Sequence, residues 1–238
     1  MTLIMAVKWE DRVIVVSDSR TKVGNAIVPP FHEKIDVIDD VLVGLAGELA
    51  YCQYYVDEMR AGKLAGENVM SREFHRGMQA KLIHMGQVTQ VDEKGEPQET
   101  CVGPMQMILA QGATLRVSSS DELPMDVPYA TIGSGAAVAN NYMYFLLQGN
   151  PVPLNTFNTS VGSLVHELAY IGQRVAATDV SVSGPWFYAD TVDLGIHRLP
   201  GYAEIRTDES QPVNSIPPQP AGPEEPIYAS GRKNPWTP

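Results

Sequence analysis

Apolar residues gather in short runs over the first 46 residues, and these runs are typical of buried β-strands. Residues 2–8 and 12–17 are almost continuously apolar, with the polar break Trp9-Glu10-Asp11 between them. Such runs predict a hairpin whose strands are buried on both faces. Residues 34–38 and 41–46 repeat the pattern around Asp39-Asp40, so a second strand pair is expected there.

After Gly47 the hydrophobic pattern takes the period of an α-helix. A first helix is expected from Leu49 to just before Gly62, and a second from about Arg72 to Met85. The polar residues 86–100 indicate a surface insertion. Beyond it, strands are expected at 105–110, 114–118 and 129–132, helices at 134–147 and 160–176, and two last strands near 180–183 and 191–196.

This order of elements predicts an α+β fold, a four-layer αββα sandwich. Two face-to-face, mostly antiparallel sheets would form its centre, with helices on the outside. A doubly wound parallel sheet does not fit, because strands and helices do not alternate one by one. Residues 1–206 are predicted to form this single domain. Residues 207–238 hold eight of the 18 prolines and few aliphatic residues, so an extended or disordered tail is expected there.

The composition narrows the classes of function. A net charge of −11 argues against a nucleic-acid partner, because phosphate binding needs Lys and Arg clusters. The apolar runs are shorter than the ~18 residues of a membrane helix, and no basic stretch typical of a signal peptide precedes the first one. Cys52 and Cys101 have no paired spacing, so a reduced cytoplasmic protein is expected. Metal-ligand spacings and Gly-rich phosphate motifs are both missing, so no metal and no other cofactor is expected.

The second residue of the chain is the first candidate for chemistry. Removal of Met1 would leave Thr2 with a hydroxyl and a free α-amine on one residue. An alkyl hydroxyl is a weak nucleophile that needs an adjacent base, and an α-amine, with an ordinary pKa of roughly 8, can be that base. Asp18 and Lys34 follow at successive spacings of sixteen residues. Taken singly, Asp18 reads as a turn former and Lys34 as a solvated side chain, whereas their convergence with Thr2 would make a self-activated threonine.

Four motifs in this order resemble the proteasome β-subunit family, including its bacterial relatives among the N-terminal nucleophile hydrolases. Residues 18–25, Asp-Ser-Arg-Thr-Lys-Val-Gly-Asn, match the family's Asp-Ser-Arg-x-x-x-Gly-Asn, and Lys34 stands at the family's spacing. Residues 44–47, Gly-Leu-Ala-Gly, precede a predicted helix as in the family, and residues 132–135, Ile-Gly-Ser-Gly, resemble its Gly-Ser-Gly before the third helix. The resemblance reaches to about residue 197 and implies the sandwich fold of that family.

The resemblance also implies roles for individual residues. Thr2 would be the nucleophile and Lys34 the buried cation beside it, which lowers the pKa of the terminal amine. Asp18 would hold Lys34 in place and favour its charged form. The Gly47 backbone N–H would stabilise the oxyanion of the tetrahedral intermediate. Ser134 would form a hydrogen bond near the amine and help to transfer its proton.

Two parts of the site are less well defined by the resemblance. The family's acid near a Ser-Gly pair would fall on Val180, whereas the chain has Asp179, which aligns better with the bacterial relatives. Asp179 is therefore either a member of the site or a turn residue at the start of a strand, since a slip of one residue reverses the face of a side chain. By position, the pocket for the residue before the scissile bond would be lined by Thr21, His32, Leu45 and Leu49, together with Asp36 and Gln53.

The resemblance implies a threonine peptidase that cleaves unfolded polypeptides inside a ring, or stacked rings, of its own copies. A separate ATP-dependent unfoldase would deliver folded substrates, because the chain lacks ATPase motifs. Only Met1 precedes Thr2, so an aminopeptidase would suffice to expose the nucleophile. Two alternatives stay open from the residues: a non-catalytic, proteasome-like assembly subunit, and an amidase that acts on a small molecule.

Overall fold

The computed structural model describes residues 2–20, 22–23, 26–27, 34–84, 105–119, 122–147, 160–179 and 182–199. One five-stranded sheet has the order β10-β1-β2-β11-β12, and the second has the order β5-β6-β7-β8-β9. The first sheet consists of β1 (Leu3–Trp9), β2 (Arg12–Ser17), β10 (Tyr129–Gly133), β11 (Phe187–Asp190) and β12 (His197–Arg198). The second consists of β5 (Ile35–Ile38), β6 (Val41–Gly47), β7 (Met105–Gln111), β8 (Thr114–Ser119) and β9 (Met125–Asp126). A short hairpin pairs β3 (Lys22–Val23) with β4 (Ala26–Ile27).

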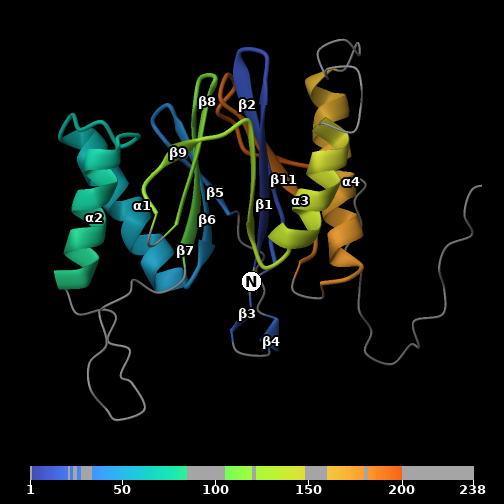
Figure 1. Ribbon diagram of the computed structural model, residues 1–238, viewed down its shortest axis with the longest axis horizontal. Helices are drawn as coiled ribbons and strands as arrows, with labels where there is room; N and C mark the ends of the chain where they lie inside the picture. The colour runs from blue at the N-terminus through green and yellow to red at the C-terminus, as the bar shows by residue number, and fades with distance from the viewer. Residues whose placement is uncertain are drawn as a thin grey trace, which may run out of the picture. The chain divides into compact units, whose positions relative to one another are not determined.

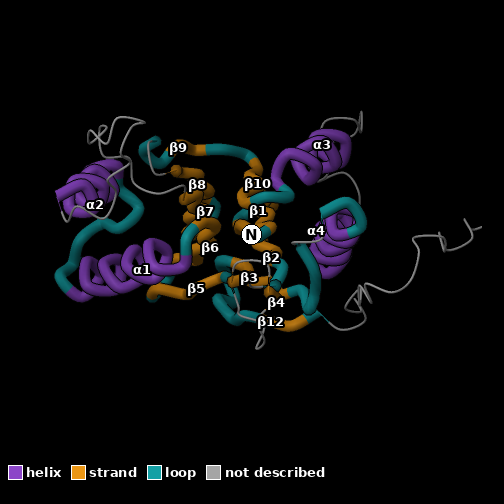
Figure 2. The backbone as a smooth tube through the Cα atoms, turned by 90° about the horizontal axis from the view of Figure 1, so that it is seen from below, coloured by secondary structure: helices purple, strands orange, loops and turns teal. Residues whose placement is uncertain are grey.

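Four helices cover the outer faces of the two sheets (Figures 1 and 2). The helices are α1 (Leu49–Leu64), α2 (Arg72–His84), α3 (Ala136–Leu147) and α4 (Val161–Ala176). The first two lie on the sheet that contains β6 and β7, and the last two lie on the sheet that contains β1 and β2. All strand pairs of both sheets are antiparallel. The predicted four-layer αββα sandwich is confirmed.

The continuous apolar run of β1 reflects burial on both faces of its sheet. Successive side chains of a strand point to opposite faces. Leu3, Met5 and Val7 belong to the core beneath α3 and α4, whereas Ile4 and Ala6 belong to the core between the two sheets. All five side chains are at most 1% exposed. A third core lies between α1, α2 and the second sheet, so the sandwich has three apolar interfaces between its four layers.

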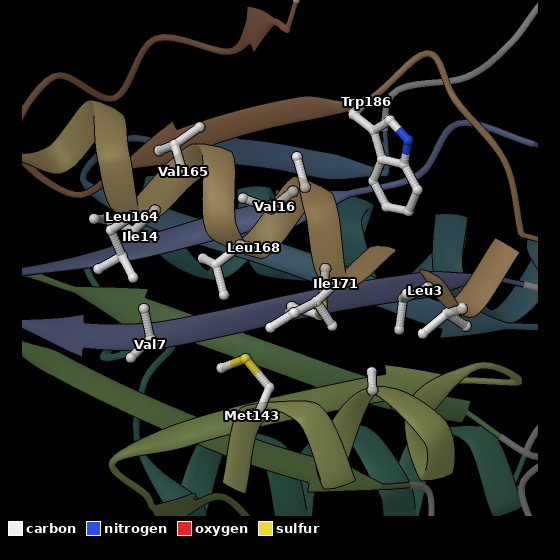
Figure 3. Packing of buried hydrophobic residues seen from close by; sticks show 14 of the residues in the cluster. Leu3, Val7, Ile14, Val16, Met143, Leu164, Val165, Leu168, Ile171 and Trp186 are labelled. Carbon is white, nitrogen blue, oxygen red and sulfur yellow. The ribbon is translucent and has the colours of Figure 1, made fainter. Parts of the chain in front are cut away.

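The core under α4 is closed by the indole of Trp186, which is 1% exposed (Figure 3). The side chains of α4 that face it include Leu164, Leu168 and Ile171, as the helical period predicts. Gly172 leaves the space that the ring occupies, because a Cβ at this position would collide with the ring atoms of Trp186. The indole therefore packs directly against the helix backbone.

The last two predicted strands are wrong in position. Residues 182–186 are not in a strand, and the strand β11 begins at Phe187. Residues 191–196, which were predicted to form a strand, are a turn and a loop instead, and β12 follows at His197. The reason is local: the Asp190 carboxylate accepts hydrogen bonds from the N–H groups of Val192 and Asp193, and such side-chain bonds stabilise turns.

Several predictions concern residues outside the described part of the chain. These are the domain boundary at residue 206, the tail over 207–238 and the insertion over 86–100. Among the helices that the structure describes, none has both the length and the apolar character needed to cross a bilayer.

Adding one methyl group under Trp186 tests the packing of α4. Gly172→Ala places a Cβ against the fully buried indole, so we expect a loss of about 1–3 kcal/mol in the free energy of unfolding. Gly162→Ala in the same helix is the matched control, because its Cβ meets only the Ser160 hydroxyl at 3.7 Å and helix propensity favours Ala by up to about 1 kcal/mol. Denaturant unfolding of both variants measures the difference, and equal stabilities would contradict the proposed packing.

Candidate active site

Antiparallel pairing brings strand ends from both sheets to one end of the sandwich. In the first sheet, Leu3 at the start of β1 pairs with Gly133 at the end of β10. Ile4 pairs with Ser17 at the end of β2. In the second sheet, Gly47 at the end of β6 pairs with the start of β7. The predicted site residues from distant parts of the sequence therefore come from the same end of the fold.

Asp18 is a buried side chain at this end with several hydrogen bonds. Its side chain is 0% exposed, and it follows directly after β2. One carboxylate oxygen, Oδ1, accepts from the Leu3 backbone N–H at 2.8 Å, and the Asp18 N–H donates back to the Leu3 carbonyl at 3.0 Å. The other oxygen, Oδ2, accepts from the N–H groups of Arg20 at 3.2 Å and Ser183 at 3.5 Å. Asp18 thus ties together the start of β1, the end of β2 and the segment before β11.

Lys34 shares an acceptor with the start of β1. Its Nζ donates to Asp18 Oδ1 at 2.7 Å, and its side chain is 10% exposed. The same oxygen accepts from Leu3 N, so the ammonium lies within two hydrogen-bond lengths of the peptide bond between Thr2 and Leu3. The predicted association of Lys34 with Asp18 is present in the structure, immediately next to Thr2.

Burial perturbs both members of this ion pair. Loss of solvent is the largest effect on Asp18 and raises the pKa of its carboxyl, although the Lys34 charge and the hydrogen bonds oppose this. Loss of solvent also lowers the pKa of Lys34, against the attraction of Asp18, and the nearby Arg20 charge lowers it further. Asp18 therefore favours the charged lysine, as the sequence predicts, but burial outweighs that attraction.

Thr2 is 7% exposed and lies directly against Gly133. Gly133 has a φ of +97°, and a Cβ built on it would collide with the carbonyl group of Thr2 and approach the Thr2 Cβ at 3.3 Å. A glycine is required here for two reasons. Its backbone is in a region that other residues rarely adopt, and the backbone segments at Gly133 and Thr2 approach each other closely. The Gly-Ser-Gly segment therefore packs directly against the candidate nucleophile.

Ser134 and Asp179 form a direct contact at the same place. The Ser134 hydroxyl donates to the Asp179 carboxylate at 3.0 Å. Asp179 follows α4, and its backbone N–H donates to the Val175 carbonyl at 2.8 Å, which continues the last turn of the helix. The carboxylate at position 179 thus contacts the Gly-Ser-Gly segment, while the Asp179 carbonyl accepts from the Val182 N–H at 3.0 Å as in a turn, so features of both interpretations of Asp179 are present.

Gly47 ends β6, is exposed, and has a φ of +152°. It pairs with Met105, and the preceding residue Ala46 pairs with Gln106. The Gln106 side chain in turn accepts a hydrogen bond from the Gly133 N–H at 2.8 Å. The link from Gly47 to the Thr2 side of the site therefore runs through Gln106, the β7 residue next to the pairing partner of Gly47.

The predicted pocket residues differ in burial and in their partners. Leu45 is 9% exposed and packs in the core beneath α1, whereas Leu49 is 69% exposed at the start of α1. Asp36 forms an ion pair with Arg60 of α1, and the amide of Gln53 donates to a carboxylate of the same helix. Thr21 and His32 lie outside the described residues.

Other ionisable groups in the described chain are explained by packing. His75 is completely buried, stacks on Tyr55 and contacts the Val69 carbonyl at 2.8 Å through Nε2. Burial lowers the pKa of His75 to about 4 and raises the pKa of the Cys52 thiol to about 11, so both groups are neutral at pH 7. Within the described ranges, His, Cys, Asp and Glu side chains form no group of three that could hold a metal ion.

Two residues of the site were missed by the sequence analysis. Gln106 gives no signal, because a single polar residue at the start of an apolar strand has no motif around it. Ser183 was assigned to a strand, yet its N–H donates to Asp18 and its carbonyl accepts from the Ser19 N–H at 3.4 Å. Both residues act through pairings between segments far apart in the sequence.

Comparison with solved structures identifies the fold. BPH from Thiobacillus denitrificans, in complex with epoxomicin, matches with a TM-score of 0.58 and 14% sequence identity over 79% of this chain and 97% of that chain. Eukaryotic HslV from Trypanosoma brucei matches with a TM-score of 0.57 and 16% identity over 79% and 98% of the two chains. No protein-family model and no curated protein matches the sequence. The chain has the proteasome β-subunit-like fold of the N-terminal nucleophile hydrolases.

Removing the cation from the buried ion pair tests its energetics. Lys34→Met leaves the Asp18 carboxylate buried without its partner, so we expect a loss of about 3–5 kcal/mol in stability at pH 7. The pKa of Asp18, which burial already raises, then rises further. As the pH falls through this raised pKa, the native state binds a proton before the unfolded state does, so the deficit relative to wild type shrinks.

Urea unfolding of Lys34→Met at a series of pH values between neutral and acidic measures this effect. Lys63→Met is the matched control, because Lys63 pairs with the exposed Asp40, and a pair of that kind contributes at most about 1 kcal/mol. The double variant Asp18→Asn/Lys34→Met removes the buried charge and should recover part of the stability at pH 7. A deficit in Lys34→Met that is constant with pH would contradict this account.

Proposed function

We propose that this chain is an N-terminal threonine peptidase, in which removal of Met1 exposes the amine and hydroxyl of Thr2. The observation that carries the proposal is the shared acceptor: Asp18 Oδ1 binds both the Leu3 N–H and the Lys34 ammonium. A lysine is thereby held beside the residue that would become the N-terminus. Lysine side chains are rarely buried without a partner, and the Lys34 side chain is only 10% exposed beside the start of β1.

The chemistry requires the terminal amine to pass protons in each direction while a bond to the Thr2 Oγ forms and later breaks. The terminal amine takes the proton of the Thr2 hydroxyl, and Oγ attacks the carbonyl carbon of the substrate peptide bond. The tetrahedral intermediate collapses when the peptide nitrogen takes the proton back and leaves as an amine. Water, deprotonated by the same amine, then attacks the ester carbon; the bond to Oγ breaks, Oγ takes the proton from the amine, and the acyl group leaves as a carboxylic acid. In every step the terminal amine is one partner of the proton transfer, and the reacting oxygen or nitrogen is the other.

Lys34 would assist this transfer through its charge. A positive charge near the terminal amine disfavours the ammonium form, so it lowers the pKa of that amine and leaves more free base at pH 7. The Gly47 N–H would donate to the oxyanion, and loss of such a donor costs about 2.7–4 kcal/mol in other hydrolases.

Ser134 and Asp179 would complete the proton path. When the Ser134 hydroxyl donates to Asp179, its lone pairs stay available to accept from the terminal amine of Thr2. The close contact of Gly133 with Thr2 supports this role, because Ser134 is the next residue. Asp179 would then fix the direction of the hydroxyl, while Ser134 itself contacts the amine.

We further propose that the peptidase works as a ring or as stacked rings of its own copies in the cytoplasm. Its substrates would be unfolded polypeptides, and a separate ATP-dependent unfoldase would supply them. These proposals rest on the resemblance of the motifs to proteasome β-subunits. The buried Cys52, whose pKa is raised to about 11, is compatible with a chain that needs no disulfide from this residue.

Covalent labelling tests the nucleophile directly. The purified chain, shown by intact mass to begin at Thr2, is incubated with epoxomicin, the epoxyketone present in the structure of BPH. We expect one adduct per chain in the wild type and none in Thr2→Ala, because that variant keeps a removable Met1 but lacks the hydroxyl. Thr114→Ala is the matched control and should react like the wild type. Thr114 is the first residue of β8, whereas the site lies at the end of the sandwich where β8 ends.

The outcomes of this labelling separate the two main functions. A wild-type chain that begins at Thr2 and gains no mass would support the non-catalytic assembly subunit instead. In a chain that retains Met1, the amine of Thr2 is part of a peptide bond and cannot act as the base. For such a chain the labelling experiment is repeated after treatment with methionine aminopeptidase. An adduct that persists in Thr2→Ala would place the reactive group elsewhere and contradict the proposed nucleophile.

A double-mutant cycle tests the pairing of Ser134 with Asp179. We expect Ser134→Ala and Asp179→Ala each to lower the second-order rate of epoxomicin labelling by at least about tenfold, since general acid–base groups contribute on the order of 10²–10⁴. The double variant should be no slower than the slower single variant, because both act on one proton path. Asp126→Ala, which breaks an exposed pair with Arg116, is the control. Fully additive losses would contradict a shared role.

A further inference from the structure

Gln106 occupies an unusual position for a polar side chain. On β7, Met105, Met107 and Leu109 pack beneath the helices α1 and α2, whereas Ile108 belongs to the core between the sheets. Because strand side chains alternate, Gln106 shares the face of Ile108 and looks toward the other sheet. It is the last residue of that face at the site end of β7, and it is exposed.

The Gln106 side chain forms a hydrogen bond between the two sheets. Its Oε1 accepts from the Gly133 N–H at 2.8 Å. Gly133 ends β10 in one sheet, and Gln106 belongs to β7 in the other. The apolar core between the sheets resists separation, and polar bonds between segments that adjoin the two sheets, such as Lys34 to Asp18 and Thr191 to Gly112, add direction to their packing. The hydrogen bond of Gln106 supplies such a direction at the end where the candidate site lies.

The two ends of this hydrogen bond both adjoin proposed catalytic groups. On the β10 side, Gly133 lies against Thr2 and precedes Ser134. On the β7 side, Gln106 pairs with Ala46, the residue before Gly47. The bond therefore connects β10, whose last residue lies against Thr2, to β7, the neighbour of the strand that ends in Gly47.

We propose that Gln106 is a positioning residue of the site, which fixes Gly133 beneath Thr2 and holds it in register with Gly47. This role rests on the proposed peptidase function. The hydrogen bond of the side chain is to the Gly133 N–H, so it would act through Gly133. Small displacements of a nucleophile from its productive geometry lower rates strongly, whereas loss of one exposed hydrogen bond has a small effect on folding.

The first test removes the acceptor but keeps the shape. Gln106→Met has a side chain of similar length without a carboxamide oxygen, so the Gly133 N–H loses its partner. We expect the second-order rate of epoxomicin labelling at Thr2 to fall by about 10- to 100-fold, while the thermal midpoint changes little. Gln111→Met is the matched control, because it removes a side-chain hydrogen bond to Asp40 at the other end of the same strand.

The second test keeps the acceptor but changes its charge. Gln106→Glu can still accept from the Gly133 N–H, so we expect it to label within a few-fold of the wild type at its optimal pH. Its carboxylate near Thr2 favours the charged form of the terminal amine and raises the pKa of that amine. The acidic limb of the labelling rate against pH should therefore shift to higher pH, which would show that position 106 lies close to the reactive amine.

The outcomes distinguish this proposal from the peptidase proposal. A reactive wild type with an equally reactive Gln106→Met overturns the positioning role alone. A Gln106→Glu variant that folds and keeps the acceptor, yet loses labelling rate about 10- to 100-fold at its optimal pH, also overturns it, and this result is available even if Gln106→Met does not fold. A wild-type chain that begins at Thr2 and does not react overturns both proposals together.

Discussion

The buried carboxylate of Asp18 is the interaction on which the rest of this site depends. It accepts four hydrogen bonds, from the backbone N–H groups of Leu3, Arg20 and Ser183 and from the Lys34 ammonium. Three of these donors come from segments that are distant in sequence from one another. Burial makes the carboxylate expensive to ionise, and the Lys34, Leu3 and Ser183 donors each reduce that penalty. The same geometry that satisfies the charge therefore also assembles the site.

Much of the fold follows from local sequence patterns. The apolar runs of β1 and β2 predict burial on both faces, because these strands lie in the middle of the sheet and contact both an apolar helix layer and the opposing sheet. The helical period predicts α4 to within one residue, since Leu164, Leu168 and Ile171 form one stripe that faces the core. These elements are predictable because their burial depends on their own side chains.

The remaining features depend on contacts between distant segments. The turn after β11 is set by the Asp190 carboxylate rather than by hydrophobic period, so the final strands were predicted in the wrong places. The residues of the Asp18 and Lys34 motif could be predicted because they resemble a known family, whereas Gln106 belongs to no motif. Its bond to Gly133 exists only because two sheets pack face to face, and the register of that packing is not encoded near either residue.

The contact between Asp18 and Ser183 has a consequence during synthesis of the chain. Asp18 leaves the ribosome early, yet one of its donors is 165 residues further along. A nascent chain can form the first hairpin but must still wait for the segment before β11 to satisfy that carboxylate. If Thr2 is the nucleophile, translation order itself keeps the reactive arrangement incomplete until almost the whole described fold has emerged. A partly synthesised chain would thus be unable to cleave neighbouring nascent polypeptides.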